Sequence, residues 1–510
     1  MPQQRVPYSI GDWSGGVNDD LNPVKVAPNQ LSLIRNWWWN GGTLEERPGL
    51  TKLNATAISG TPAIQGLFDY IYSGGASQQF VTVAGGKVYK DTSGTFSDIT
   101  GSISITSGQN NPWTFLVFQD VLIAFGPDAP WKWTGTGNIA ALGGSPPTAR
   151  YCATKWNYLF VSGISTDRGL VRYADLNTYE TWSAGNTIRV RTYGNDYITG
   201  LVPFGDMVIA LCQNSLQKIT YNATLTPPFI NNVLLEGIGC PHQRAFVNVD
   251  DRAYFIDQHY RVRVIEPSDV IAAYNVPDVS TGRLTNTLKG LDLGRRPYIC
   301  GAYYRPFESI IWAVSRQGAT TNDFCIVMNV ADNKPKFATW DELGINAITT
   351  RETTTGADLV VGNYGGRVYT IEGTSDDGTA ITTQVDTRWE DLGSPQVEKL
   401  LRRVDVESRQ PGGASMTLRT YQDYDPAVIQ TVTVPGRVAS GVSASQWGRG
   451  YWGNAVWPSG TAGEELVYNK LDINAKGRVI KLQFYNNQTQ AGPRMALCRV
   501  TLYEKASGMY

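Results

Sequence analysis

Short apolar runs that end in turn residues recur along most of this chain. Between residues 63 and 387 an apolar run, a Gly, Asn or Asp turn, and a second run rich in β-forming residues follow one another repeatedly. Such pairs predict β-hairpins, because glycine and asparagine supply the positive φ angles of tight turns. The apolar runs start near Phe80, Val121, Tyr158, Met207, Ala253, Ile310 and Leu359.

The starts are about 37 to 57 residues apart, which is the spacing expected of β-propeller blades. The first run of each hairpin is almost wholly apolar, as a strand covered on both faces should be. We therefore predict an all-β protein with a β-propeller of roughly six to eight blades, seven favoured, over residues 63–387. A stack of β-sandwiches would give similarly spaced hairpins and is the alternative architecture.

The spacing of the predicted strands changes towards the C-terminus. Strand candidates over residues 388–510 are enough for one antiparallel β-sandwich. A Gly/Ser-rich insert, residues 435–463, interrupts them and carries large aromatic side chains. Such an insert either folds under the domain as an Ω-type loop or presents anchors to a partner. The interface candidates are Trp447, Tyr451, Trp452 and Trp457.

The N-terminal arm, residues 1–62, contains the stretch NWWWNGGTLEERPG. In a strand, Trp37 and Trp39 share one face and Trp38 takes the other, so three consecutive tryptophans suit a strand covered on both sides. We expect a hairpin that ties the arm onto the propeller as the closing strand of its last blade. Upstream, residues 27–36 predict a short helix. The residues of this closing hairpin are Trp37, Trp38, Trp39, Gly41, Gly42, Arg47, Pro48 and Gly49.

Composition supports a β-rich chain and narrows the range of partners. Glycine (53 of 510 residues) and aromatic residues (11%) are abundant, as in proteins with many turns and strands. Lys and Arg number 44 against 45 Asp and Glu, which argues against tight, charge-driven binding of nucleic acid. The N-terminus lacks an apolar signal segment, and no run reaches the roughly 18 apolar residues of a membrane span. The sequence therefore predicts a soluble protein without membrane insertion.

Catalytic and metal-binding signatures are sparse. The six cysteines lie far apart without a C-x-x-C pair, which favours buried thiols over disulfides or a zinc site. Of the two histidines, His242 follows a proline and His259 lies in a predicted hairpin turn, so both are expected to be structural. Asp376 and Asp377 predict a turn. We expect no metal, no cofactor, no catalytic residue and hence no enzyme.

Acidic residues at strand ends leave one enzymatic alternative open. Glycan-cleaving enzymes flank the scissile bond with two carboxylates. A propeller would bring such groups from different blades to the mouth of its channel. The acids at or near predicted strand ends are Asp120, Asp206, Asp257 and Glu352.

Two parts of the chain resemble one protein family. The N-terminal stretch DWSGGVNDDLNPVKVAPNQLSLIRNWWWNGGTLEERPG is similar to the opening of tail proteins of short-tailed double-stranded DNA phages. It has an aromatic-x-Gly-Gly-x-Asn start, a helix ending at an Asn, a turn and a closing Arg-Pro-Gly. TRWEDLGSPQVEKLLRRVDVES, YQDYDP and WGRGYWGNAVW are similar to the later part of the same proteins. The family is the podovirus tail nozzle, also called tail tubular protein B or packaged-DNA stabilisation protein.

The resemblance implies a structural protein of the virion tail, assembled in the host cytoplasm. It would form a homo-hexameric ring below the portal and the head-to-tail adaptor protein, with tail fibres or spikes and tail-tip proteins attached nearby. The ring would enclose a channel that retains packaged double-stranded DNA and releases it on infection. Balanced charge is compatible with DNA that passes through without tight binding. A phage tail propeller that binds or hydrolyses host surface glycans is the alternative.

Overall fold

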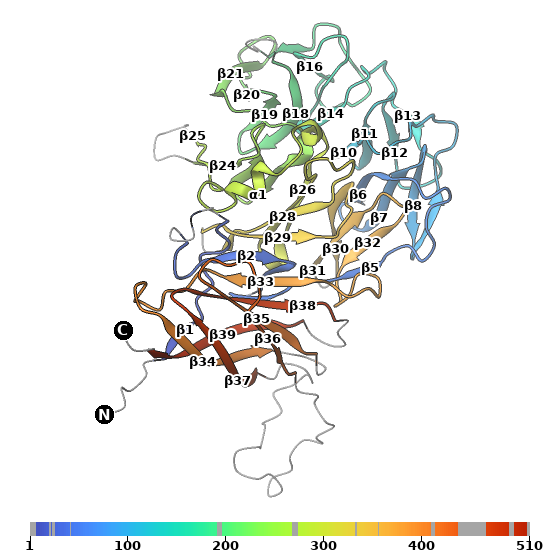
Figure 1. Ribbon diagram of the computed structural model, residues 1–510. Coiled ribbons are helices and arrows are strands. Elements are labelled where there is room, and N and C mark those ends of the chain that lie inside the picture. Colours follow the sequence, from blue (N-terminus) through green and yellow to red (C-terminus); the bar gives the residue numbers. More distant parts are fainter. Residues whose placement is uncertain are drawn as a thin grey trace, which may run out of the picture.

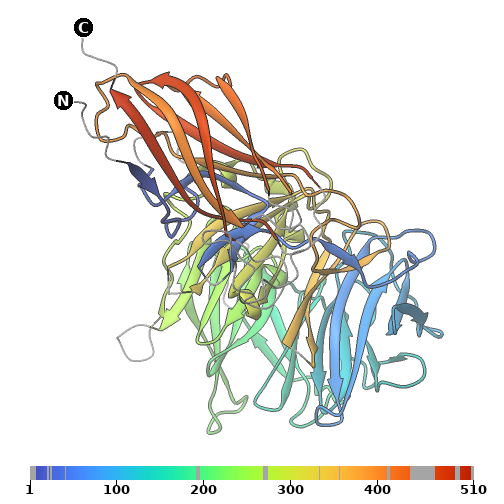
Figure 2. The same cartoon turned by 90° about the horizontal axis from the view of Figure 1, so that it is seen from below.

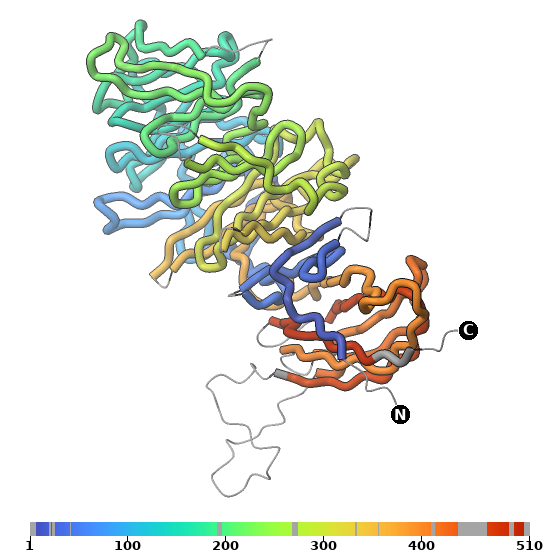
Figure 3. The backbone as a smooth tube through the Cα atoms, turned by 90° about the vertical axis from the view of Figure 1, so that its left-hand side faces the viewer, coloured from blue at the N-terminus to red at the C-terminus, as the bar shows by residue number. Residues whose placement is uncertain are grey.

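A β-propeller and a β-sandwich lie end to end in an elongated molecule (Figure 1, Figure 3). The expected all-β class, with a propeller followed by a C-terminal sandwich, is confirmed. The computed structural model describes residues 7–19, 22, 26–40, 42–190, 196–267, 274–331, 334–354, 356–409, 414–436, 466–488 and 494–506.

The described residues form seven blades of four strands each, and the first strands of most neighbouring blades contact one another. Blades one to three are β6 (Ile64–Tyr72), β7 (Ser77–Ala84), β8 (Lys87–Thr92), β9 (Thr95–Asp98); β10 (Thr114–Phe118), β11 (Val121–Phe125), β12 (Trp131–Trp133), β13 (Ala140–Ala141); and β14 (Tyr151–Lys155), β15 (Tyr158–Ser162), β16 (Leu170–Tyr173), β17 (Thr187–Arg189). Blades four to six are β18 (Ile198–Phe204), β19 (Met207–Cys212), β20 (Ser215–Tyr221), β21 (Phe229–Glu236); β22 (Phe246–Val249), β23 (Arg252–Ile256), β24 (Val262–Pro267), β25 (Tyr274–Asn275); and β26 (Cys300–Tyr304), β27 (Ser309–Val314), β28 (Phe324–Asn329), β29 (Lys336–Asp341).

The seventh blade is completed by the N-terminal arm. Its first three strands are β30 (Ala347–Thr353), β31 (Gly356–Gly362) and β32 (Val368–Ile371), and its outermost strand is β5 (Leu50–Lys52). β5 pairs antiparallel with β32, placing Leu50 opposite Ile371 and Lys52 opposite Tyr369. Segments about 320 residues apart in sequence thus share one sheet, which closes the ring.

The burial of each strand follows the apolar pattern of the sequence. The second strands β11, β15 and β19 are buried along their whole length, whereas the outermost strand β21 is mostly half-buried or exposed. The apolar side chains gather in clusters between adjacent blades. Stability of the ring therefore comes from blade-to-blade packing, because each sheet buries both of its faces.

Hydrogen bonds from side chains and main chain link the inner ends of the blades around the axis. Because each crosses between two blades, together they hold the inner strands in register. The donors and acceptors are Trp113 N to Gln65 O, Thr114 Oγ1 to Arg150 O, Gln243 Nε2 to Cys152 O, Trp312 Nε1 to Ala245 O, Arg244 Nη1 to Asn346 O, and Asn346 Nδ2 to Ile64 O.

The sandwich is built from the C-terminal strands and the N-terminal arm together. One sheet contains β1 (Tyr8–Ile10), β3 (Trp37–Asn40), β4 (Thr43–Glu46), β39 (Ala496–Ala506), β34 (Lys399–Arg409) and β37 (Leu466–Gly477). The other contains β2 (Leu31–Arg35), β33 (Thr383–Thr387), β38 (Ile480–Asn486), β35 (Met416–Gln422) and β36 (Gln430–Val434). The first and last of these strands, β1 and β39, lie side by side (Figure 2).

The second sheet continues without a break into the sixth blade. β2 pairs antiparallel with β33 on one side and parallel with β29 on the other, giving a nine-stranded sheet that runs from blade six into the sandwich (Figure 1). Thr339 donates its hydroxyl to Ile34 O at 2.9 Å across this boundary. One hydrophobic cluster likewise extends from blades four to seven into the sandwich. The two bodies are therefore joined by a shared sheet as well as by a chain connection.

Three expectations about these segments are wrong. Residues 27–36 do not form a helix, because a β-bulge between Leu31 and Leu33 turns both Leu31 and Ile34 inward and imitates helical spacing. The tryptophan hairpin is not the closing strand of the last blade, since β4 pairs with β39 of the sandwich and β5 closes the propeller. β33 falls within residues 63–387 but pairs with sandwich strands, so the propeller ends before it.

Helices are few and short among the described residues. They are α1 (Thr285–Lys289) and the 3₁₀ turns η2 (Gln243–Ala245), η3 (Leu293–Tyr298) and η4 (Arg305–Phe307). Asp19 of the arm caps α1 by accepting hydrogen bonds from Asn286 N and Thr287 N. None of these helices is long and apolar enough to cross a membrane.

The fold predicts the reactivity of the thiols. Burial raises the pKa of Cys152, Cys212 and Cys240 to about 12, and Cys300 and Cys325 are also buried, whereas Cys498 is half-buried. In the native protein a thiol reagent should therefore modify Cys498 alone, and slowly, because the thiolate is the reactive form. In denaturant it should modify all six cysteines. Mass spectrometry of the modified peptides checks the site. Rapid native modification of a propeller cysteine would contradict the packing described.

Candidate functional site

The tryptophan hairpin is buried between the propeller and the sandwich. Trp37 lies opposite Glu46 and Trp39 opposite Leu44 in the antiparallel pair β3–β4. Trp37, Trp38 and Trp39 are 1%, 0% and 2% exposed, so none of them can offer a face to a ligand. Because these side chains are buried, the hairpin is a packing element and not a ligand-binding surface.

Trp38 faces the sixth blade. Its ring stacks on Phe307 with a centroid distance of 4.1 Å and meets Trp340 edge-on at 5.4 Å. The guanidinium of Arg494 lies 5.8 Å from the Trp38 ring centroid and also binds the Glu45 carboxylate at 2.8 Å. Aromatic pairs of this geometry add stabilisation beyond their buried area.

The opposite side of the hairpin faces the interior of the sandwich. Glu46, on the same side as Trp37 and Trp39, accepts hydrogen bonds from the Thr383 hydroxyl at 2.8 Å and from Asn486 Nδ2 at 2.9 Å. The alternation of side chains along β3 thus sends one tryptophan to the propeller and two to the sandwich.

A buried arginine connects this hairpin to the seventh blade. The side chain of Arg47 is 0% exposed and forms a two-pronged ion pair with Asp376, at 2.8 Å and 2.5 Å. Its Nε donates to Asn36 Oδ1 at 3.0 Å. Asn36 in turn accepts from Asp341 N and donates from Nδ2 to Thr382 O. We call Asn36, Arg47 and Asp376 the joint cluster, because it touches blade six, blade seven and the start of the sandwich.

The residues that follow Arg47 in the chain are held in place by close packing. A Cβ atom on Gly49 would lie 2.0 Å from Ser375 O, so only glycine fits there. Pro48 accepts a hydrogen bond from Arg47 Nη1. Gly42 adopts a φ of 86° in the hairpin turn, and Gly41 lies outside the described residues. Gly49 and Pro48 therefore direct the chain from the hairpin into β5.

The aromatic insert cannot be placed. Residues 437–465 are not among those the structure describes, and they include the interface candidates Trp447, Tyr451, Trp452 and Trp457.

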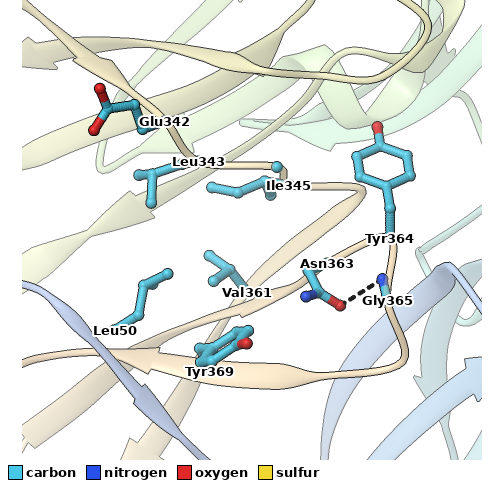
Figure 4. Close-up of a pocket in the computed structure, with 10 residues that line it drawn as sticks. Leu50, Glu342, Leu343, Ile345, Val361, Asn363, Tyr364, Gly365 and Tyr369 are labelled. Carbon is cyan, nitrogen blue, oxygen red and sulfur yellow. Dashed lines mark hydrogen bonds between the residues drawn. The ribbon is translucent and has the colours of Figure 1, made fainter. Parts of the chain in front are cut away.

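A small hollow lies beside the joint cluster, at the edge of the seventh blade. It has a volume of about 270 Å³, and its apolar wall is formed by Leu50, Leu343, Ile345 and Val361 (Figure 4). Tyr369 closes one side. Glu342, Asn363 and Tyr364 also line the hollow, so polar groups lie at its rim beside the apolar wall.

The acids that could serve glycan cleavage are spread over the propeller. Asp120 and Asp206 lie in the turns between the first and second strands of blades two and four, and Glu352 lies in the first strand of blade seven. Asp257 follows the second strand of blade five, which places it at the opposite face of the ring. Its buried carboxylate pairs with Arg263 at 3.0 Å. The four acids therefore come from four different blades, and one of them is engaged by an arginine.

Neither histidine has partners suited to catalysis. His242 is buried, accepts a hydrogen bond from Arg244 N at 3.0 Å and meets the Tyr151 ring edge-on. His259 is exposed in a turn. Within the described ranges, no group of three or more His, Cys, Asp or Glu side chains could hold a metal ion.

Comparison with known proteins adds no family. No family model matches the chain, and no curated protein matches it. Solved structures do match, among them the WD40 domain of Pan2 from Neurospora crassa, with a TM-score of 0.40 and 10% sequence identity. That match covers 64% of this chain and 95% of the WD40 domain. The propeller architecture of the present chain rests on its own hydrogen-bonded sheets.

Sequence inspection missed the partners of Arg47. Asp376 was expected only to form a turn, and it does bridge to Thr379, but its carboxylate also neutralises an arginine 329 positions away in sequence. Arg47 itself was the available sequence signal. An arginine that follows an apolar hairpin and precedes Pro-Gly is expected to be buried, and a buried arginine needs an acidic partner.

Loss of Arg47 should destabilise the whole chain. Arg47→Ala leaves the Asp376 carboxylate and Asn36 Oδ1 without their partner, which should lower the free energy of unfolding by about 3–5 kcal/mol. The matched control is Lys52→Ala, which breaks the exposed ion pair with Asp377 and should change stability by about 1 kcal/mol or less. Urea denaturation of both variants measures the difference. Equal effects would show that the joint cluster is not a stabilising contact.

The buried His242 predicts a pH dependence of stability. Burial, followed by Arg244 and Arg150, lowers the pKa of His242 well below 6.5. As the pH falls below 6.5, His242 becomes protonated in the unfolded chain but stays neutral in the folded chain. The stability due to His242 is therefore present above pH 6.5 and is lost as the pH falls below it.

Relative to His242→Gln, the wild type should lose up to about 1.4 kcal/mol of stability per pH unit between pH 6 and pH 5. Chemical denaturation of both proteins across this window measures the difference. Parallel curves for the two proteins would contradict a neutral, buried His242.

Proposed function

We propose that this chain is a structural component of a short-tailed phage tail. It forms a homo-hexameric nozzle ring below the portal and adaptor, and the ring retains double-stranded DNA and then releases it. The neighbours proposed for it are the head-to-tail adaptor, tail fibres or spikes, and tail-tip proteins. It acts as a non-enzymatic part of the virion.

The observation that supports this proposal is the role of the residues that carry the family resemblance. Asn36, Arg47 and Gly49 belong to the resembling N-terminal stretch. Asn36 and Arg47 are part of the joint cluster, and Gly49 follows it in the chain. This joint makes one body of the propeller and the sandwich. A ring that resists the pressure of packaged DNA needs subunits whose domains do not hinge, and a shared nine-stranded sheet meets that need.

The charge balance also supports a conduit over a DNA-binding protein. Lys and Arg (44) are matched by Asp and Glu (45) over the chain. Several arginines and lysines of the propeller face a carboxylate of the same or the next blade, for example Lys132 with Glu180 and Arg351 with Asp91. Paired cations contribute little to binding phosphates, so DNA can slide past such a surface.

Assembly with an adaptor tests the proposal directly. The full-length chain, mixed with adaptor–portal complexes of its phage, should add a six-fold ring visible in electron micrographs, because heterologous contacts between identical subunits close into rings. A chain that stays monodisperse and never joins such complexes would contradict the proposal. Release of reducing ends from host surface polysaccharide would instead assign the chain to the glycan hydrolases.

The aromatic insert should matter for assembly more than for folding. Replacing Trp447, Trp452 and Trp457 together by Ala should abolish ring formation and leave the thermal unfolding midpoint of the monomer within about 2 °C of the wild type, because interface anchors are enriched in tryptophan. The control is the triple replacement by Phe, which keeps aromatic anchors and should retain rings. Normal rings together with loss of soluble protein would show that these side chains belong to the core.

A further inference from the structure

The hollow at the edge of the seventh blade is small and open to solvent. Its volume of about 270 Å³ lies below the roughly 300–1,000 Å³ of pockets that enclose a small-molecule ligand. Glu342 and Gly344, which belong to its lining, are exposed. A guest would therefore be held on one side by the protein and would extend out of the hollow on the other, as the side chain of a bound polypeptide does.

The buried part of the lining is aliphatic. Leu343, Ile345 and Val361 are each 2% exposed. The first two lie in the link between β29 and β30, and Val361 lies in β31. Leu50 of β5 adds an aliphatic wall (Figure 4). A branched aliphatic side chain would exchange water for apolar contacts in this part of the hollow.

One hydrogen-bond donor of the hollow has a fixed direction. Asn363 Oδ1 accepts hydrogen bonds from Gly365 N at 2.8 Å and from Arg367 N at 2.9 Å, which determines the orientation of the side-chain amide. Its Nδ2 lies on the side of Val361 and Tyr369 (Figure 4). Among the described residues this nitrogen has no hydrogen-bond partner, and it is not enclosed by protein. A guest in the hollow can therefore accept a hydrogen bond from Asn363 Nδ2.

Tyr369 supplies a group that can accept a hydrogen bond as well as donate one. It lines the same hollow, and over the part of the chain that the structure describes its hydroxyl has no hydrogen-bond partner either. A peptide unit presents one C=O acceptor and one N–H donor. The free amide of Asn363 and the hydroxyl of Tyr369 match these two groups.

The charges at the rim add a preference for a cation. Arg35 lies 3.0 Å from both Asp341 and Glu342, and Arg316 lies 2.9 Å from Asp341 and 2.7 Å from Asp323. In this group two guanidinium groups face three carboxylates, which leaves one negative charge in excess. The side chain of Glu342 is 47% exposed, more than those of the other two acids. A guest with a positive charge outside the hollow is therefore favoured, and an anion is disfavoured.

We infer that the hollow is an anchor site for a partner polypeptide. A branched aliphatic side chain of the partner fills it, and the main chain beside that side chain binds Asn363 Nδ2 and the Tyr369 hydroxyl. A neighbouring lysine or arginine of the partner approaches Glu342. A small neutral ketone shares the aliphatic group and the carbonyl but has neither the N–H nor the cation, which distinguishes the two kinds of guest.

Saturation-transfer NMR of the full-length protein with N-acetyl-leucyl-lysine amide tests the inference. The leucine methyl groups should receive the most saturation, because they contact the buried aliphatic lining. N-acetyl-alanyl-lysine amide should bind at least about tenfold more weakly, because it lacks the carbon atoms that fill the hollow. N-acetyl-leucyl-glutamate amide should bind about threefold more weakly, because its charge has the wrong sign for Glu342.

Three results would overturn the inference. They are the absence of saturation transfer to the leucine methyl groups, equal binding of the leucyl and alanyl peptides, and binding of methyl isobutyl ketone as strong as that of the leucyl-lysine peptide. The last result would assign the hollow to small neutral molecules.

Asn363→Asp locates the site. It keeps an oxygen that accepts from Gly365 N and Arg367 N, and it replaces the free amide by a second oxygen. Affinity for the uncharged N-acetyl-leucine methylamide should fall by at least about fivefold, because the donor to its carbonyl is lost. The matched control is Asn222→Asp in blade four, where Oδ1 likewise accepts from Thr224 N, at 3.1 Å; it should keep wild-type affinity. Equal affinity of all three proteins would reject the site.

Glu342→Gln gives a second measurement, which also serves if Asn363→Asp does not fold. This exposed substitution should remove the preference for the leucyl-lysine over the leucyl-glutamate peptide and leave the binding of N-acetyl-leucine methylamide unchanged. A preference that persists in the folded variant would contradict the proposed orientation of the partner. None of these measurements involves ring assembly, so failure of the anchor site and failure of the proposed tail function are distinguishable.

Discussion

The ion pair between Arg47 and Asp376 is the contact on which the joining of the two bodies depends. A fully buried guanidinium must be neutralised and hydrogen-bonded, and here a carboxylate from beyond blade seven and the side chain of Asn36 do both. Asn36 also holds Asp341 of blade six and the start of β33. Because these groups satisfy one another, the positions of β2, the tryptophan hairpin and β5 are fixed together.

As a result, the second sheet of the sandwich continues across the boundary between the sandwich and the propeller. β2 fills the gap between β29 and β33, Trp38 packs onto blade six, and Trp37 and Trp39 turn into the sandwich. The N-terminal arm thus contributes to the sandwich, to the joint and to the closure of the propeller in sequence order. A single segment with these three roles keeps the propeller and the sandwich in a fixed relation, as the proposed tail function requires.

The propeller itself separates its apolar and polar contacts. Apolar side chains pack between blades, while the inner ends of the blades are linked by polar groups around the axis. Most of these polar groups satisfy each other.

The sequence by itself determined the all-β class, the hairpin repeats of the blades and the hairpin of Trp37 to Glu46, because these follow from local apolar alternation and turn residues. It could not determine which sheet each arm strand joins, since β2, β4 and β5 look alike in isolation and are assigned by pairing with strands hundreds of residues away. The bulge at Ser32 even gave a strand the apolar spacing of a helix. Only the tertiary structure decided that Arg47 meets Asp376, because ion pairs depend on distance in space, which residue order does not contain.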